Sequence, residues 1–325
     1  MFRYIIKRLI MLIPVLIGVS FLVYFTLDLA PGDIVDVIAP DDATVEDKER
    51  MREEMGLNRN VVVRYGEYMW KLMHGDMGES YTTKQSVWDA FMEKAPNTLY
   101  LGIASVIVSV GLSLPLGIYS AQHRGTWKDN LAMVAALCGL SMPNFWLGLL
   151  LMIGFSLKLG WFPSGGARGF SSIVLPAITI GTGMMAILTR TTRSSMLDVL
   201  RQDYLRTARA KGVSERDVVY KHALKNALIP IITIIGTQLG SVLGGAVLTE
   251  SVFSWPGVGR LIIDSLNSRD TPMVTGCIIM TTMFFSLILL AVDLIYAVVD
   301  PRIKAQYARP KRKKGEKLNV KPASV

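Results

Sequence analysis

Residues 201–225 read RQDYLRTARAKGVSERDVVYKHALK, a polar island between two long apolar segments of this 325-residue chain. The run from Asp203 to Lys211 is rich in helix-forming residues, and Gly212 is the residue type that most readily adopts the left-handed turn after a helix. Ser214 and Asp217 have the spacing of a capping box, which starts a second helix. The polar island therefore predicts a helix, a break and a helix, a rigid element suited to docking a partner that moves.

The rest of the chain has the composition of a membrane protein. Apolar residues make up 51% of the sequence, and the mean hydropathy is +0.38, above the usual range of soluble domains. A helix needs about 20 apolar residues to cross a bilayer core of about 30 Å. We therefore expect an all-α integral membrane protein with about six transmembrane helices. The candidate spans are Leu9–Leu27, Thr98–Tyr119, Leu131–Leu157, Ile173–Thr191, Leu228–Leu248 and Val274–Val299.

The positions of the basic residues predict the orientation of these spans, because lysine and arginine near span ends favour the cytoplasmic side. Basic residues precede the first span, lie between the second and third, fill the polar island and close the chain at 311–314. These positions agree only if both termini and the polar island face the cytoplasm. Residues 31–96, where acids outnumber bases, then lie outside. The net charge of +9 therefore reflects topology, and a nucleic-acid partner is not expected.

The polar island also carries a family resemblance. RTARAKG (206–212) resembles the "EAA" loop by which permeases of ATP-binding-cassette (ABC) importers hold their ATPase subunits, although Arg206 replaces the usual acidic residue. DYLRTARAKG followed by HALKNALIP is similar to the dipeptide/oligopeptide/nickel permease family, and the resemblance covers roughly residues 3–305. Other matching blocks are APGD (30–33), MGL (55–57), HGDMG (74–78), LPLGI (114–118), SMPNFW (141–146), TRSSML (192–197) and LTESVFSWPGVG (248–259).

The resemblance implies a B-type, dipeptide permease-like subunit in a bacterial or archaeal inner membrane. Such a subunit forms half of a translocation path with a second homologous permease. Two ATPase subunits drive it, and an extracytoplasmic binding protein delivers dipeptides or oligopeptides. Nickel, haem or glutathione are alternative substrates within the same family. The residues expected to couple to the ATPase are Asp203, Tyr204, Arg206, Thr207, Ala208, Arg209, Ala210, Lys211, Gly212, Ser214 and Glu215.

We expect four segments along the chain. They are a cytoplasmic N-terminus with the first span (1–29), an extracytoplasmic segment (30–96), a permease core (97–305) with its coupling loop at 201–225, and a basic, disordered cytoplasmic tail (306–325). The extracytoplasmic segment is too short and polar to build a large core of its own. It is therefore either a small cap packed on the spans or a lip that meets the binding protein.

Several residues are candidates for the translocation path or a subunit seam. Gly236, Gly240 and Gly244 recur every four residues, a pattern that allows close helix packing within the subunit, at a seam or along the path. Asn144 follows Pro143, which is expected to kink the third span, and its amide serves either a neighbouring helix or the path. Glu250 is expected at the outer end of the fifth span, in a gate or in a solvated loop.

The sequence contains no motif for covalent chemistry. No phosphate-binding loop occurs, since the chain has no Gly-Lys pair, and its three histidines lie in different loops; we expect no cofactor, metal site or catalysis. A secondary transporter is an alternative, but neither inverted repeats nor a central pair of acids is visible. A membrane-tethered DNA-binding regulator is another, but spans on both sides of the polar island would hinder entry into a DNA groove. An ABC importer permease is therefore the preferred interpretation.

Overall fold

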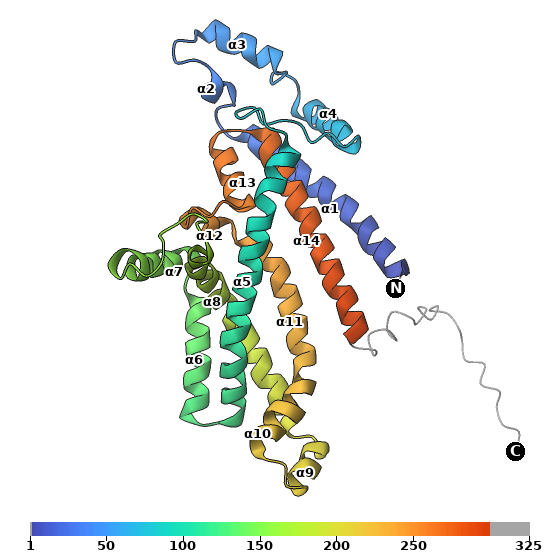
Figure 1. The fold of residues 1–325 in the computed structure, drawn as a ribbon. Helices are drawn as coiled ribbons and strands as arrows, with labels where there is room; N and C mark the ends of the chain where they lie inside the picture. The colour runs from blue at the N-terminus through green and yellow to red at the C-terminus, as the bar shows by residue number, and fades with distance from the viewer. Residues whose placement is uncertain (1, 300–325) are drawn as a thin grey trace, which may run out of the picture.

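A computed structural model of the chain describes residues 2–299, and all of its regular elements in that range are helices (Figure 1). The tail at 306–325 and the end of the expected core at 300–305 lie outside the described residues. The all-α membrane fold is confirmed. In order the elements are α1 (Phe2–Leu29), α2 (Val35–Ile38), α3 (Val45–Glu54), α4 (Val61–Met73), α5 (Val87–Gln122), α6 (Trp127–Ser141), α7 (Asn144–Leu151), η1 (Met152–Lys158), α8 (Phe170–Leu200), α9 (Asp203–Ala210), α10 (Glu215–Asp217), η2 (Val218–Ala223), α11 (Leu224–Gly245), α12 (Val247–Val252), α13 (Val258–Asn267) and α14 (Thr271–Val299).

Within residues 2–299, five helical stretches are long and apolar enough to cross a membrane, and a bent pair brings the number to six if it counts as one span. That pair corrects the third expected span, Leu131–Leu157. Instead of a kinked helix, α6 ends at Ser141 and the chain turns by 100° into α7 and η1. Met142 is extended (φ −93°, ψ 130°), as expected for a residue before proline. Pro143 therefore ends the helix completely instead of kinking it.

The centre of the bundle is the close contact between α5 and α8, which depends on small residues. A Cβ atom added to Gly117 would lie 2.5 Å from Thr192, and one added to Gly181 would lie 2.8 Å from the Ser105 carbonyl oxygen. Such contacts are possible only where side chains are minimal. The small residues on this side of α5 recur every four positions and are buried: Ser105, Ser109, Ser113 and Gly117.

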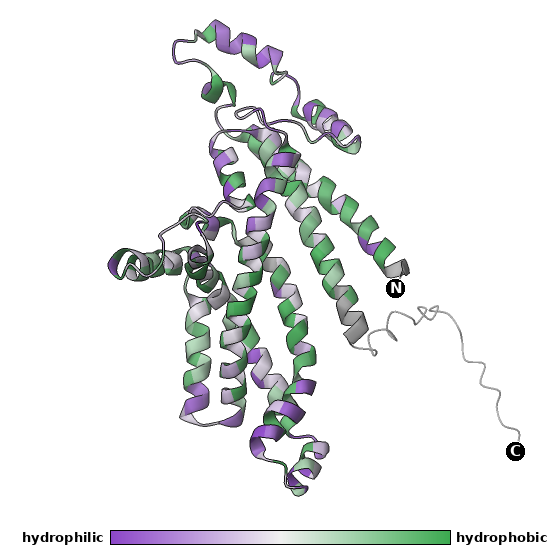
Figure 2. Ribbon diagram, in the orientation of Figure 1, coloured by the Kyte–Doolittle hydropathy of each residue, from purple (hydrophilic) through white to green (hydrophobic). Residues whose placement is uncertain are grey.

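The two polar segments lie at opposite ends of the bundle. Figure 1 places α2, α3 and α4 at one end and α9 and α10 at the other. Hydropathy follows the same division, with apolar helices between the two polar ends (Figure 2). This arrangement is the one that the charge distribution predicts, although the side of the membrane on which each end lies stays a prediction.

Helix α3, in the segment between α1 and α5, is held by its own cap and by the loop that precedes it. Thr44 caps α3 by accepting a hydrogen bond from the Asp47 N–H (3.2 Å), while Asp47 bonds back to the Thr44 N–H (3.1 Å). No residue of α3 is buried; Arg52 instead holds α3 to the preceding loop through Asp33 (Nε–Oδ2 2.6 Å). Partial burial raises the pKa of Asp33, but the hydrogen bond and charge of Arg52 outweigh it and leave the pKa lowered.

Labelling from each side of the membrane tests the topology. Single cysteines replacing Glu46 in α3 and Arg216 in α10, both exposed, should react with a membrane-impermeant maleimide from opposite sides, because the two positions lie at opposite ends of the bundle. The background should carry Cys138→Ser and Cys277→Ala, since Cys277 is buried. Glu46→Cys should react in intact cells, and Arg216→Cys only after the membrane is opened. Reaction of both in intact cells would contradict the predicted topology.

Candidate functional site

The polar island contains the expected helix, break and helix. Gly212 takes a left-handed conformation (φ +78°) directly after α9 and its C-cap, Lys211. Its N–H donates to the Arg209 carbonyl (3.0 Å), and the Val213 N–H donates to the Ala208 carbonyl (3.2 Å). These two bonds form the Schellman motif that ends a helix at glycine. Ser214 then caps α10 by accepting a hydrogen bond from the Asp217 N–H (3.2 Å).

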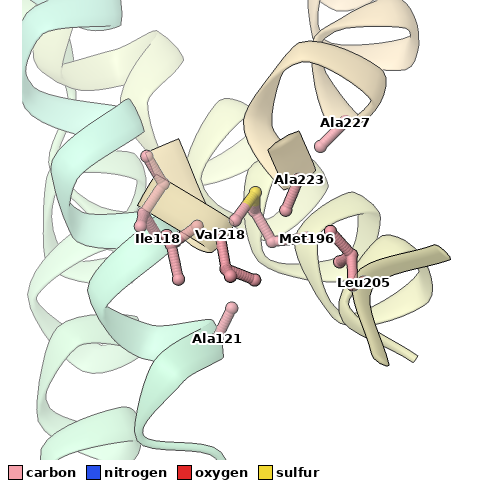
Figure 3. Packing of buried hydrophobic residues seen from close by; sticks show 8 residues of the cluster. Ile118, Ala121, Met196, Leu205, Val218, Ala223 and Ala227 are labelled. Carbon is pink, nitrogen blue, oxygen red and sulfur yellow. The ribbon is translucent and has the colours of Figure 1, made fainter. Parts of the chain in front are cut away.

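A buried cluster fixes the polar island to three long helices. Leu205 of α9 is fully buried and packs with Met196 of α8 and with Val218 and Ala223 of η2 (Figure 3). Ile118 and Ala121 bring the end of α5 into the same cluster, and Ala227 brings in α11. The cluster therefore joins α9 to α5, α8 and α11 through one shared contact.

Most of the predicted coupling residues point to solvent. Ala208 is different, because it is partly buried and packs against the cluster around Leu205. A charge at Ala208 would therefore disturb the packing of the polar island itself as well as any docked partner. The exposed residues of the predicted set are Asp203, Tyr204, Arg206, Thr207, Arg209, Ala210, Lys211, Gly212, Ser214 and Glu215.

Two polar contacts hold the halves of the polar island together. Arg209 binds Glu215 with two hydrogen bonds (Nε–Oε2 3.0 Å and Nη2–Oε1 2.8 Å), a fork geometry that fixes direction as well as distance. The Tyr204 hydroxyl donates to the His222 carbonyl (3.2 Å) and accepts from the Asn226 amide (2.7 Å). Asn226 was not among the sequence candidates; a lone asparagine at the start of a span gives no signal of its own.

A charged clamp next to the polar island was also missed. Asp129, in the first turn of α6, is buried and receives two hydrogen bonds from Arg193 of α8 (2.8 and 2.7 Å). The Ser120 hydroxyl and the Gly125 N–H complete its coordination. Removing Arg193, which is itself partly buried, would leave the buried carboxylate without its charged partner. The clamp therefore ties the α5–α6 turn to the part of α8 that leads into the polar island.

Glu250 is buried in α12 and does not lie in a solvated loop, which corrects the second of the two expectations; its place in a gate stays a prediction. It is fully buried, and its carboxylate accepts hydrogen bonds from the Thr98 hydroxyl (2.7 Å) and the Arg260 N–H (3.0 Å). A Cβ atom on Gly257 would lie 2.3 Å from a carboxylate oxygen. The WPGVG turn therefore wraps around Glu250, and its first glycine makes room for the carboxylate.

Three of the remaining path candidates, Gly236, Gly240 and Asn144, lie at contacts within the chain. A Cβ on Gly236 would lie 2.2 Å from Val292, and one on Gly240 would lie 2.8 Å from Leu289, so both glycines face α14. The surroundings of Gly244 lie outside the described residues. Asn144 is half-buried, and a Cβ atom added to Gly183 of α8 would lie 2.8 Å from the Asn144 Oδ1. These contacts favour the packing interpretations, and a role in the path stays a prediction.

A cavity of about 480 Å³ opens between α5, α13 and α14, but its chemistry does not suit a peptide. Its walls are mainly aliphatic and aromatic, with a few hydroxyl groups. A zwitterionic peptide placed there would lose hydration without gaining charged partners, which is costly. No group of three or more histidine, cysteine, aspartate or glutamate residues that could hold a metal ion occurs in the described part of the chain.

The contact between Glu250 and Gly257 predicts a clear steric effect. Gly257→Ala should lower the stability of the purified chain by about 1–3 kcal/mol, because the new methyl group overlaps the carboxylate. Gly257 has φ −102°, so alanine causes no backbone strain. Thermal unfolding in detergent is the measurement. Gly111→Ala, with nothing within 4 Å of its added Cβ, is the matched control and should unfold at or above the wild-type temperature. Equal unfolding temperatures for Gly257→Ala and wild type would contradict the steric account.

Comparison with known proteins agrees with this geometry. The family model described as "Binding-protein-dependent transport system inner membrane component" matches residues 113–305, and its N-terminal counterpart matches residues 1–102. The glutathione transport system permease protein GsiC of Escherichia coli (strain K12) is 42% identical over 304 residues, which cover 94% of this chain and 99% of the relative. The same protein of Salmonella typhimurium is 41% identical over an equal length.

A solved structure shares the fold. The MetNI methionine ABC transporter in an inward-facing conformation matches with a TM-score of 0.55 and 18% identity, over 65% of this chain and 96% of the transporter chain. The sequence matches cover nearly all of the chain and include the polar island. The chain therefore belongs to the binding-protein-dependent transport system inner membrane components, and it is a non-catalytic, multi-pass permease subunit of an ABC importer, whose ATPase activity lies in separate subunits.

Proposed function

We propose that this permease imports short peptides and that the polar island is its contact with an ATPase subunit. The observation that carries the proposal is the attachment of α9 to α5, α8 and α11 through the cluster around Leu205. In this proposal both termini and the polar island face the cytoplasm, and residues 30–96 lie outside. The complete importer contains a second homologous permease, two ATPase subunits and an extracytoplasmic binding protein.

The packing of the polar island supports a lever mechanism. Closure of the ATPases on ATP would move α9, and the buried cluster would carry that movement into three spans at once. The clamp between Asp129 and Arg193 extends the same rigid unit to α6. A rigid group of helices of this kind can rock between outward- and inward-open arrangements.

Short peptides are the substrate class with the most support. The curated relatives are named for glutathione transport, and glutathione is itself a tripeptide. The sequence blocks resemble the dipeptide and oligopeptide permeases, so both comparisons point to small zwitterionic peptides. Because the cavity within one chain is mainly apolar, it does not suit a zwitterionic peptide. In this proposal the polar path is therefore built between the two permease subunits. Nickel has less support, because the described residues offer no cluster of metal ligands.

A bulky residue on the exposed surface of α9 tests the docking role. Thr207 is exposed, so Thr207→Trp should leave the polar island folded but block the approach of an ATPase. Loss of a central interface contact of about 1.4 kcal/mol or more lowers affinity at least about tenfold. Substrate-stimulated ATP hydrolysis by the reconstituted importer should fall accordingly.

Thr83→Trp is the matched control, because Thr83 is also exposed but lies in the segment at the opposite end of the bundle. The amount of co-purifying ATPase should remain near wild type in this control. Normal stimulation in Thr207→Trp, in a complex of normal composition, would show that the polar island is not the ATPase contact.

Uptake into proteoliposomes tests energy source and substrate together. The importer, reconstituted with its binding protein and ATPases, should accumulate radiolabelled dipeptide or glutathione only when ATP is present at the ATPase side. A protonophore should leave uptake unchanged, since no ion gradient drives it. Uptake that stops with the protonophore would contradict the ABC mechanism. ATP-driven nickel uptake without peptide uptake would contradict the substrate assignment alone.

A further inference from the structure

Helix α4 lies beside the end of the first span and carries three different faces. Successive residues of a helix are 100° apart, so side chains can be assigned to faces by position. Tyr65, Tyr68 and Leu72 share the face that is partly buried towards α1, while Glu67 and Lys71 share a polar face. The third face, between these two, is apolar and exposed. It consists of Val62 (59% exposed), Val63 (52%), Trp70 (64%) and Met73 (69%), and we call it the α4 apolar strip.

Contacts with α1 give the depth at which α4 lies. The span is bounded by charged residues at Arg8 and Asp28, which are separated by about 30 Å along a helix, the thickness of a bilayer core. Arg64 of α4 pairs with Asp28, at the boundary of this core. The Tyr65 hydroxyl reaches further in, donating to the Ile17 carbonyl (3.1 Å) and contacting the Ser20 hydroxyl (2.9 Å). Helix α4 therefore lies at the level of the last turns of the span.

At the same level the surface of α1 is apolar and exposed. Phe21 is 42% exposed and Leu22 is 65% exposed. Phe21 also touches α4, with its ring 5.3 Å from that of Tyr65 in an edge-on arrangement. The exposed apolar surface of α1 is therefore continuous with α4, and the α4 apolar strip extends it sideways.

We propose that α4 is an interfacial helix, with its apolar strip bound to the lipid bilayer at the boundary between headgroups and acyl chains. Amphipathic helices of this kind lie in the membrane plane with an apolar face buried about 5–10 Å. Trp70 and Lys71 are residue types suited to that boundary, since the indole prefers the interface and the lysine amine can reach the headgroups. Helix α4 thereby fixes the height of α3, which has no buried residue of its own.

Spin labels on two faces of α4 test this proposal in the complete importer reconstituted into liposomes. Trp70→Cys and Met73→Cys place labels on the apolar strip, and Glu67→Cys places a matched label on the polar face. The background carries Cys138→Ser and Cys277→Ala. Power saturation then compares collisions with oxygen, which is concentrated in lipid, and with a water-soluble nickel chelate.

The expected result is an inversion between the faces. Labels at 70 and 73 should collide with oxygen more than with the chelate, and the label at 67 should do the opposite. Equal chelate access at all three positions would place the apolar strip in water and overturn the proposal. Low access to both agents at 70 and 73 would show that a protein subunit covers the strip, which would also overturn it. The experiment reports on α4 whether or not the peptide substrate is identified correctly.

Discussion

The structure depends on how closely α5 and α8 approach each other. Within a bilayer, helices gain little from hydrophobic burial, so association rests on backbone proximity and close packing. Ser105 and Gly181 provide that proximity at the centre of the seam, and Gly117 with Thr192 provide it near the polar island. Because the seam continues to the cluster around Leu205, the helices that span the membrane and the helix that leaves it form one packed unit.

Local chemistry is the part of this architecture that sequence predicts well. The spans follow from hydropathy. The turn at Gly212 follows from the preference of glycine for the left-handed position after a helix, and the cap at Ser214 from the preference of serine for the helix N-cap. Serine and glycine recur every four positions on α5 as well, a stripe that was not predicted as a helix contact. Gly236 and Gly240 of α11, like Ser105 and Gly117 of α5, prove to lie at contacts between helices of this chain.

What the sequence does not reveal is which distant residues meet. Glu250 reads as a residue of a loop because polar neighbours and a Pro-Gly turn follow it, yet Thr98 of another span and the turn itself enclose its carboxylate. In the sequence nothing distinguishes Asp129 and Arg193 from other charged residues, and only the fold brings the two side chains together. At Pro143 a kink was expected and a complete break is found. A proline by itself does not indicate whether contacts with neighbouring helices keep the segments before and after it aligned.

The clamp between Asp129 and Arg193 also bears on how the chain is made. Its two partners are 64 residues apart, and ribosomes add about 5–20 residues per second, so Arg193 follows Asp129 by about 3–13 s. During that interval the α5–α6 turn carries a carboxylate whose final partner has not been synthesised. The pair that joins the α5–α6 turn to α8 therefore forms only after α8 has been made.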